Sequence, residues 1–137
     1  MERSFAREVG QLALRAGETF HGEGILAVTK ALLQSGVAYV GGYQGSPISA
    51  LVDVMVQAGD VLGELGVHVE PCTNEAAAAA MLAASVAYPV RGAVTWKSIV
   101  GTNVASDALS HLGSPGVVGG ALIVVGEDTG EGSSVAQ

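Results

Sequence analysis

The sequence predicts a three-layer α/β/α protein with an open parallel sheet, and two observations indicate this fold. Short apolar runs of strand type alternate with longer segments in which apolar residues recur at helical spacing. The 20 glycines stand mostly at the junctions between these segments, which is typical of tight turns between strands and helices. Strands of this length separated by helices pair in parallel, because each crossover returns the chain to the same end of the sheet.

The first half of the chain contains two predicted helices around one predicted strand. Apolar residues at helical spacing favour a helix over Gly24–Leu33, and Gly36 follows as its C-cap. The apolar run Val37–Val40 predicts a strand that ends in the glycine-rich loop Gly41–Pro47. Pro47 suits the first turn of a helix, and the apolar spacing continues to Val56.

The second half repeats the alternation and has an unusually alanine-rich helix. Thr73 or Asn74 is positioned to cap this helix, and Glu75 falls in its first turn. The expected elements are a strand at Val67–Glu70, the alanine helix around Ala76–Ala80, a strand at Gly92–Trp96, a helix at Thr102–Leu112 closed by Gly113, and a strand at Ala121–Val125.

The length of 137 residues suits one domain. Residues 1–19, which include Arg3, Arg7 and Arg15, lack the continuous apolar core of a signal peptide and are expected to form a short helical arm before a domain at 20–137. The chain stops in a loop directly after a strand, where such sheets normally add a helix. We therefore expect a fragment or a short subunit, with a domain truncated at its C-terminus.

Composition and charge exclude several functions. The 13 acidic and 6 basic residues give a net charge of -7, which disfavours binding to nucleic acid and to anionic membrane surfaces. No apolar run reaches the ~18 residues of a membrane helix, so a soluble protein is expected. Cys72 is the only cysteine, so this chain alone holds no disulfide and no iron-sulfur cluster, and a cytoplasmic location is expected.

Polar or glycine-rich segments follow each predicted strand. In open parallel sheets the ligand site lies outside the carboxyl ends of the strands, so these segments are the candidate site. They are Gly42–Pro47, Pro71–Glu75, Trp96–Asn103 and Gly126–Ser134.

Each candidate also has an ordinary structural interpretation. The Gly-Tyr-Gln-Gly-Ser-Pro loop, with the Ser46 hydroxyl at a helix start, suits close approach to a ligand but equally suits a simple strand-to-helix turn. Glu75 could merely favour the helix dipole. Lys97 lies just past a strand end, where it could hold an anionic group or face solvent.

No metal site is predicted. His21, His68 and His111 are far apart and have no histidine or cysteine at metal-ligand spacing. Cys72 has no partner that would activate a thiolate, and we expect it to be structural. Four further acids are typical of a solvated surface, with a metal role as the lesser alternative: Asp107, Glu127, Asp128 and Glu131.

Taken in order, these segments resemble the N-terminal pyrimidine-binding domain of the large subunit of indolepyruvate ferredoxin oxidoreductases, in the 2-oxoacid:ferredoxin oxidoreductase family. The resemblance runs from about Phe20 to Ser134. The counterparts of the family motifs are Gly22-Glu23-Gly24, Gly42–Pro47, Asn74-Glu75, Trp96–Asn103 and Asp128–Ser134. Gln44, Ser46 and Ser98 depart from the family's proline, threonine and histidine, so the choice of substrate stays open.

The resemblance implies a thiamine-diphosphate-binding fold in which Glu75 hydrogen-bonds the aminopyrimidine ring and activates the cofactor. It implies further cofactor contacts from Gly45, Ser46, Pro47 and Asn103. Ser46 and Lys97 would contact the substrate, an aryl pyruvate such as indolepyruvate being the first hypothesis. The implied reaction is oxidative decarboxylation of a 2-oxoacid to an acyl-CoA.

The chain lacks the residues for the other half of such a site. It has no GDG-and-asparagine signature for the magnesium-bound diphosphate and no cysteine cluster. The resemblance therefore implies a partner domain or subunit that carries Mg²⁺ and iron-sulfur clusters, in a dimer or hetero-oligomer that uses ferredoxin and coenzyme A. The alternatives are the pyrimidine domain of a non-oxidative thiamine decarboxylase or acetolactate-type synthase, and a catalytically silent assembly module.

Overall fold

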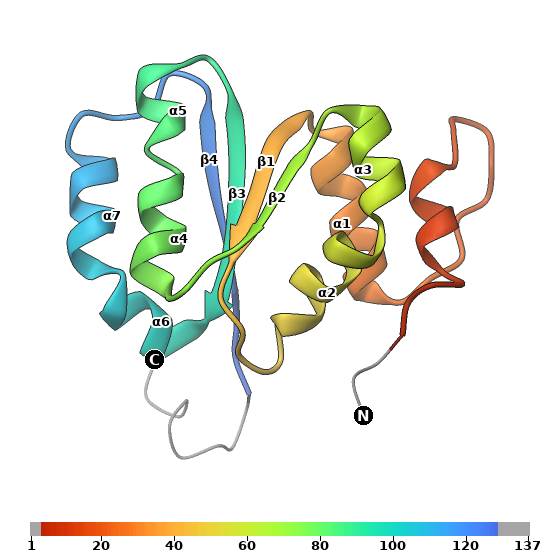
Figure 1. The fold of residues 1–137 in the computed structure, drawn as a ribbon, viewed down its shortest axis with the longest axis horizontal. Coiled ribbons are helices and arrows are strands. Elements are labelled where there is room, and N and C mark those ends of the chain that lie inside the picture. Colours follow the sequence, from red (N-terminus) through yellow and green to blue (C-terminus); the bar gives the residue numbers. More distant parts are fainter. Residues whose placement is uncertain (1–3, 129–137) are drawn as a thin grey trace.

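The computed structural model describes residues 4–128 and contains one parallel sheet between two layers of helices (Figure 1). The strands are β1 (Val37–Gly42), β2 (His68–Pro71), β3 (Arg91–Lys97) and β4 (Gly120–Gly126), in the spatial order β2-β1-β3-β4. Every pair of neighbouring strands is parallel. The predicted three-layer α/β/α fold with an open parallel sheet is confirmed.

One helical layer comes from the first half of the chain. It contains the 3-10 helix η1 (Val9–Ala13), α1 (Gly24–Gln34), α2 (Ser49–Gln57) and α3 (Gly59–Leu65). Gly36 follows α1 with a φ of 76°, a left-handed conformation that glycine adopts without steric cost, as the predicted C-cap requires. The short helix α3 was not predicted, because Gly59, Gly63 and Gly66 suggest a loop rather than a helix.

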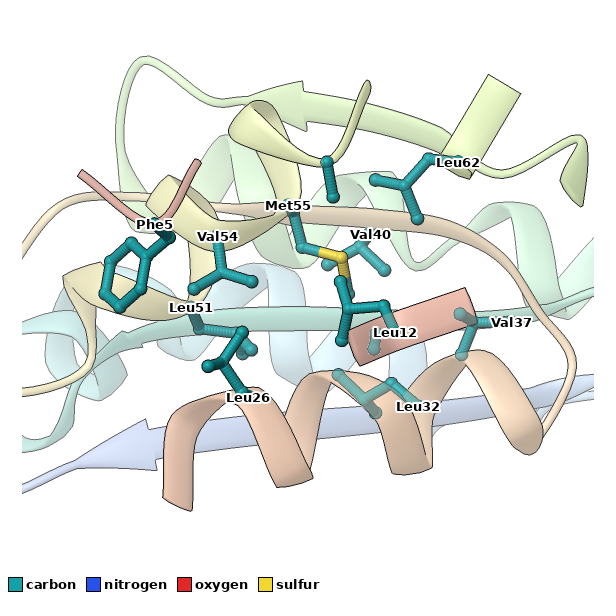
Figure 2. Packing of buried hydrophobic residues seen from close by; sticks show 12 residues of the cluster. Phe5, Leu12, Leu26, Leu32, Val37, Val40, Leu51, Val54, Met55 and Leu62 are labelled. Atoms are coloured by element: carbon teal, nitrogen blue, oxygen red, sulfur yellow. The ribbon is translucent and has the colours of Figure 1, made fainter. Parts of the chain in front are cut away.

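The first-half helices enclose a core of hydrophobic residues (Figure 2). Leu26 of α1 and Leu51, Val54 and Met55 of α2 pack together with Val40 of β1, and each is at most 1% exposed. Burial of such side chains contributes roughly 1.5–3 kcal/mol each. This core fixes α2 against β1 and so determines where the loop between them lies.

The N-terminal segment packs against this core. Phe5 is 1% exposed and Leu12 is 5% exposed, and both belong to this hydrophobic cluster. Lys30 of α1 donates hydrogen bonds to the carbonyls of Leu12 and Leu14 at 3.0 and 2.7 Å. The part of the expected arm that the structure describes therefore covers one face of the domain.

The other layer contains α4 (Glu75–Met81), α5 (Ala84–Ala87), α6 (Ser98–Val104) and α7 (Ser106–Gly113). Its core includes Ala78 and Ala79 of α4 together with Tyr39 and Trp96 of the sheet. Alanine has a small side chain, so the face of α4 with Ala78 and Ala79 can approach the sheet and α7 closely.

The single helix predicted at Thr102–Leu112 was wrong. Ala105 has φ -84° and ψ -2°, and this ψ departs from the helical value of about -42°. Ala105 is 0% exposed, and its burial in the core allows the turn between α6 and α7. α6 also begins earlier than predicted, because Ser98 follows β3 without an intervening loop.

Candidate functional site

The direction of the crossovers makes the carboxyl ends of β1 and β3 a topological switch point. From β1 the chain crosses to β2 on one side, and from β2 it crosses back over β1 to β3 on the other side. The two crossovers use opposite helical layers, as Figure 1 shows. Such a switch in direction is where open α/β sheets bind ligands, because the following loops diverge there.

The loop after β1 is held by the strands on both sides. The Tyr43 N–H donates to the Thr95 carbonyl at 3.0 Å, and the Cys72 N–H donates to the Gly42 carbonyl at 2.7 Å. The N–H groups of Ile48 and Ser49 both donate to the Gly45 carbonyl and form the turn into α2. Pro47 therefore lies in a turn rather than in the first turn of the helix, and the Ser46–Pro47 peptide bond is cis.

Gly45 gives this loop contact with the end of β3. A Cβ atom on Gly45 would lie 2.7 Å from the Lys97 Cβ, closer than carbon atoms pack. Only glycine therefore lets the loop backbone rest on Lys97 without displacing it. Ser46 and Pro47, the next two predicted site residues, are exposed at this position.

Glu75 is the first residue of α4, and Asn74 caps this helix by accepting a hydrogen bond from the Ala77 N–H at 2.8 Å. Glu75 itself is only 6% exposed. Within residues 4–128, no hydrogen bond or ion pair satisfies its carboxylate. A buried polar group without a partner costs free energy, so such a group is a strong indication of a ligand.

Lys97 ends β3 and is not the solvated side chain of the ordinary interpretation. Its Nζ lies 3.4 Å from Asp128 Oδ2, and the two side chains are 16% and 20% exposed. Asp128 lies two residues beyond β4, so this pair joins the ends of neighbouring strands. The prediction of a solvated surface was therefore wrong for Asp128, and its position after a strand end was the available signal.

Asn103 is less closely connected to these residues. It lies in α6, which packs against α4, and its side chain is exposed. Over the described range, no hydrogen bond joins it to Glu75, Ser46 or Lys97. The structure thus brings Gly45 and Lys97 into contact and places Glu75 in a helix that follows the same end of the sheet.

A cavity of about 410 Å³ that sequence reasoning missed lies beside the loop after β1. Such a cavity is visible only after α2 is packed on the sheet. Residues of β1, its loop, α2 and the end of β2 line it: Gly42, Tyr43, Gln44, Ser49, Val52, Asp53, Val56, Pro71 and Cys72.

Cys72 is half-buried in this region. Burial raises the pKa of its thiol, and the nearby Glu70 carboxylate raises the pKa further, while a backbone hydrogen bond with Gly42 opposes both effects. A thiol with a raised pKa is a poor nucleophile at neutral pH. The structure therefore gives no support for an activated Cys72.

The described residues contain no group of three or more histidine, cysteine or acidic side chains that could bind a metal ion. His68 and His111 are exposed and lie near Glu70 and Asp107, respectively. Glu131, the last acid considered for a metal, and the Thr129–Ser134 part of the final motif lie outside the described residues. No helix within residues 4–128 is long and apolar enough to span a membrane.

The fold and the site together define a class of protein: a parallel α/β domain with a topological switch point at the ends of β1 and β3 and a buried glutamate at the start of α4. Sequence comparison then gives the family. The chain is 34% identical over 108 residues to the indolepyruvate oxidoreductase subunit IorA of Thermococcus kodakarensis. The matched region covers 79% of this chain and 16% of that protein. By this similarity, the chain belongs to the IorA family.

Two further relatives agree. The IorA subunit of Pyrococcus horikoshii is 32% identical over 79% of the chain and 16% of that subunit. The IorA subunit of Methanothermobacter thermautotrophicus is 31% identical over 85% of the chain and 18% of that subunit. The chain thus spans about a sixth of the length of these relatives. No family model and no solved structure matches it.

Proposed function

We propose that this chain forms the pyrimidine-binding half of a thiamine diphosphate site in a 2-oxoacid:ferredoxin oxidoreductase. The relatives are named indolepyruvate oxidoreductase subunits, which supports a reaction on a 2-oxoacid. An aryl pyruvate such as indolepyruvate is the proposed substrate and an acyl-CoA the proposed product.

The observation that carries the proposal is the carboxylate of Glu75. Glu75 is only 6% exposed, and its carboxylate has no polar partner in the described part of the chain. A nitrogen-containing ring with a hydrogen-bonding edge would satisfy this group, and the aminopyrimidine of thiamine diphosphate would supply such an edge. The buried Glu75 carboxylate therefore fits the hydrogen-bonding edge of the cofactor ring.

The residues of this chain would divide the work as follows. Glu75 would share a proton with a ring nitrogen through a strong hydrogen bond, which shifts electron density within the ring. Gly45, Ser46 and Pro47 would contact the ring from the loop after β1, with Asn103 on α6. Lys97 and Ser46 would orient the substrate. When bound, thiamine diphosphate supplies the electron sink that decarboxylation requires.

A partner must complete the site. The sequence has no magnesium-diphosphate signature, and no metal-binding group exists within residues 4–128. We propose that a second domain or subunit binds the diphosphate with Mg²⁺, carries the iron-sulfur clusters and delivers electrons to ferredoxin. The complex is then a dimer or hetero-oligomer that also binds coenzyme A.

Titration calorimetry tests this division. The complex of the chain with its diphosphate-binding partner should bind thiamine diphosphate with Mg²⁺, and the chain alone should bind it at least ~100-fold more weakly, because it supplies only part of the contacts. If the complex forms but does not bind thiamine diphosphate, the chain is an assembly module and the proposal is wrong.

A further inference from the structure

The Lys97–Asp128 ion pair is unusual for its burial. Both side chains are at most 20% exposed. The two residues are 31 positions apart in the sequence. Buried charges are costly to desolvate, and such a pair adds little stability compared with apolar residues of similar size. The pair therefore requires an explanation beyond stability.

The pair adjoins the residues on which the loop after β1 rests. Gly45 lies on Lys97, as described above, and Ile48 lies on the end of β4, where a Cβ on Gly126 would be 2.6 Å from the Ile48 Cβ. Lys97 and Gly126 are register partners in the sheet. The two ends of the Gly45–Ile48 turn thus contact the two strands whose ends the ion pair connects.

We propose that Asp128 is a positioning residue that holds the Lys97 ammonium beside the Gly45–Ile48 turn, where it receives the carboxylate of the 2-oxoacid. This inference rests on the proposed function. A lysine side chain has several rotatable bonds, and fixing its charge before the substrate arrives removes an entropic cost from binding. A fixed ammonium distinguishes the anionic end of a 2-oxoacid from a neutral carbonyl compound.

The test is a comparison of variants in the assembled enzyme, with the 2-oxoacid as the varied substrate. Asp128→Asn should raise KM for the 2-oxoacid about tenfold, because a charge-assisted contact is lost, while kcat changes much less. The affinity for thiamine diphosphate should stay unchanged. Asp128→Glu keeps the negative charge, so its KM for the 2-oxoacid should stay close to the wild-type value.

Glu127→Gln is the matched control. Glu127 is the neighbouring residue, is exposed, and loses the same charge in this variant. It should therefore reproduce only the long-range electrostatic effect of Asp128→Asn. A second readout does not depend on turnover. The 2-oxoacid is titrated into enzymes that also carry Glu75→Gln, a variant expected to be inactive, and its affinity is compared with and without Asp128→Asn.

The outcomes separate the two proposals. The positioning role is wrong if Asp128→Asn behaves like Glu127→Gln, or if it lowers thiamine diphosphate affinity and kcat in parallel, as a purely structural residue would. If the wild-type assembly does not oxidise 2-oxoacids, or if Glu75→Gln is fully active, the proposed function itself fails, and with it the role of Asp128.

Discussion

At the scale of single residues, Asn74 and Glu75 divide two tasks at the start of α4. The Asn74 side chain accepts the hydrogen bond that caps the helix, so Glu75 is not needed for that purpose. The helix dipole therefore remains the only ordinary explanation of Glu75 at this position. Its burial without a partner among the described residues leaves ligand binding as the better explanation.

The cap itself is testable. Asn74→Ala removes the acceptor for the Ala77 N–H and should lower the free energy of unfolding by about 1 kcal/mol. Thr73→Ala is the control, because Thr73 is the adjacent exposed residue and forms no side-chain hydrogen bond with any described residue. Urea denaturation measures both, and equal losses would show that Asn74 does not act as the cap.

The raised pKa of Cys72 predicts slow alkylation by iodoacetamide near pH 8, because little thiolate is present below the pKa. Removing the Glu70 charge in Glu70→Gln should lower that pKa and increase the rate, whereas the distant Glu64→Gln should not. The rate is measured across pH by mass spectrometry. An unchanged pH profile in Glu70→Gln would contradict the electrostatic contribution, although burial is the larger cause.

At the scale of elements, β1 and β3 are kept close to their neighbours by glycines and buried hydrogen bonds. Tyr39 of β1 lies over Gly92 of β3, and a Cβ at Gly92 would overlap the Tyr39 ring. The Tyr39 hydroxyl hydrogen-bonds Ser85 Oγ at 2.7 Å, and Ser85 Oγ donates to the Gly120 carbonyl at 2.9 Å. The hydrogen bonds of Ser85 connect α5 to β1 and β4 at the amino end of the sheet, opposite the candidate site.

Two glycine substitutions should have opposite effects. Gly92→Ala forces the buried Tyr39 ring to move and should lower the free energy of unfolding by about 1–3 kcal/mol. Gly63→Ala, within the α3 helix and with open space around it, should raise this free energy by up to about 1 kcal/mol. Thermal denaturation distinguishes them, and a tolerated Gly92→Ala would contradict the packing described here.

The elements also show which parts of the fold could be predicted. The strands and α1 were located within two residues. The apolar runs of β1 and β3 are buried as the pattern implies, whereas most residues of β2 and β4 are exposed or only partly buried. The break at Ala105 and the helix α3 could not be predicted, because tertiary burial decides the first and glycines obscure the second. The order of the motifs predicted Glu75 as a candidate, but the pairing of Lys97 with Asp128 required the arrangement of β3 and β4.

At the scale of the whole molecule, the topology explains why residues from distant motifs meet. The crossover from β1 to β2 and the crossover from β3 to β4 run in opposite directions, and at this switch point Gly45 contacts Lys97. The chain spans about a sixth of the length of its IorA relatives. The proposed reaction therefore belongs to the complete assembly. Within that assembly, this chain would contribute the carboxylate that activates the cofactor.

The most direct test of this account is the rate of 2-oxoacid oxidation by the assembled enzyme carrying Glu75→Gln. Loss of a proton-sharing carboxylate should reduce kcat by ~100-fold or more. Asp60→Asn, which removes another carboxylate from the first turn of a helix, should leave kcat unchanged. A Glu75→Gln enzyme with wild-type kcat would contradict the assignment of Glu75 as the activating residue.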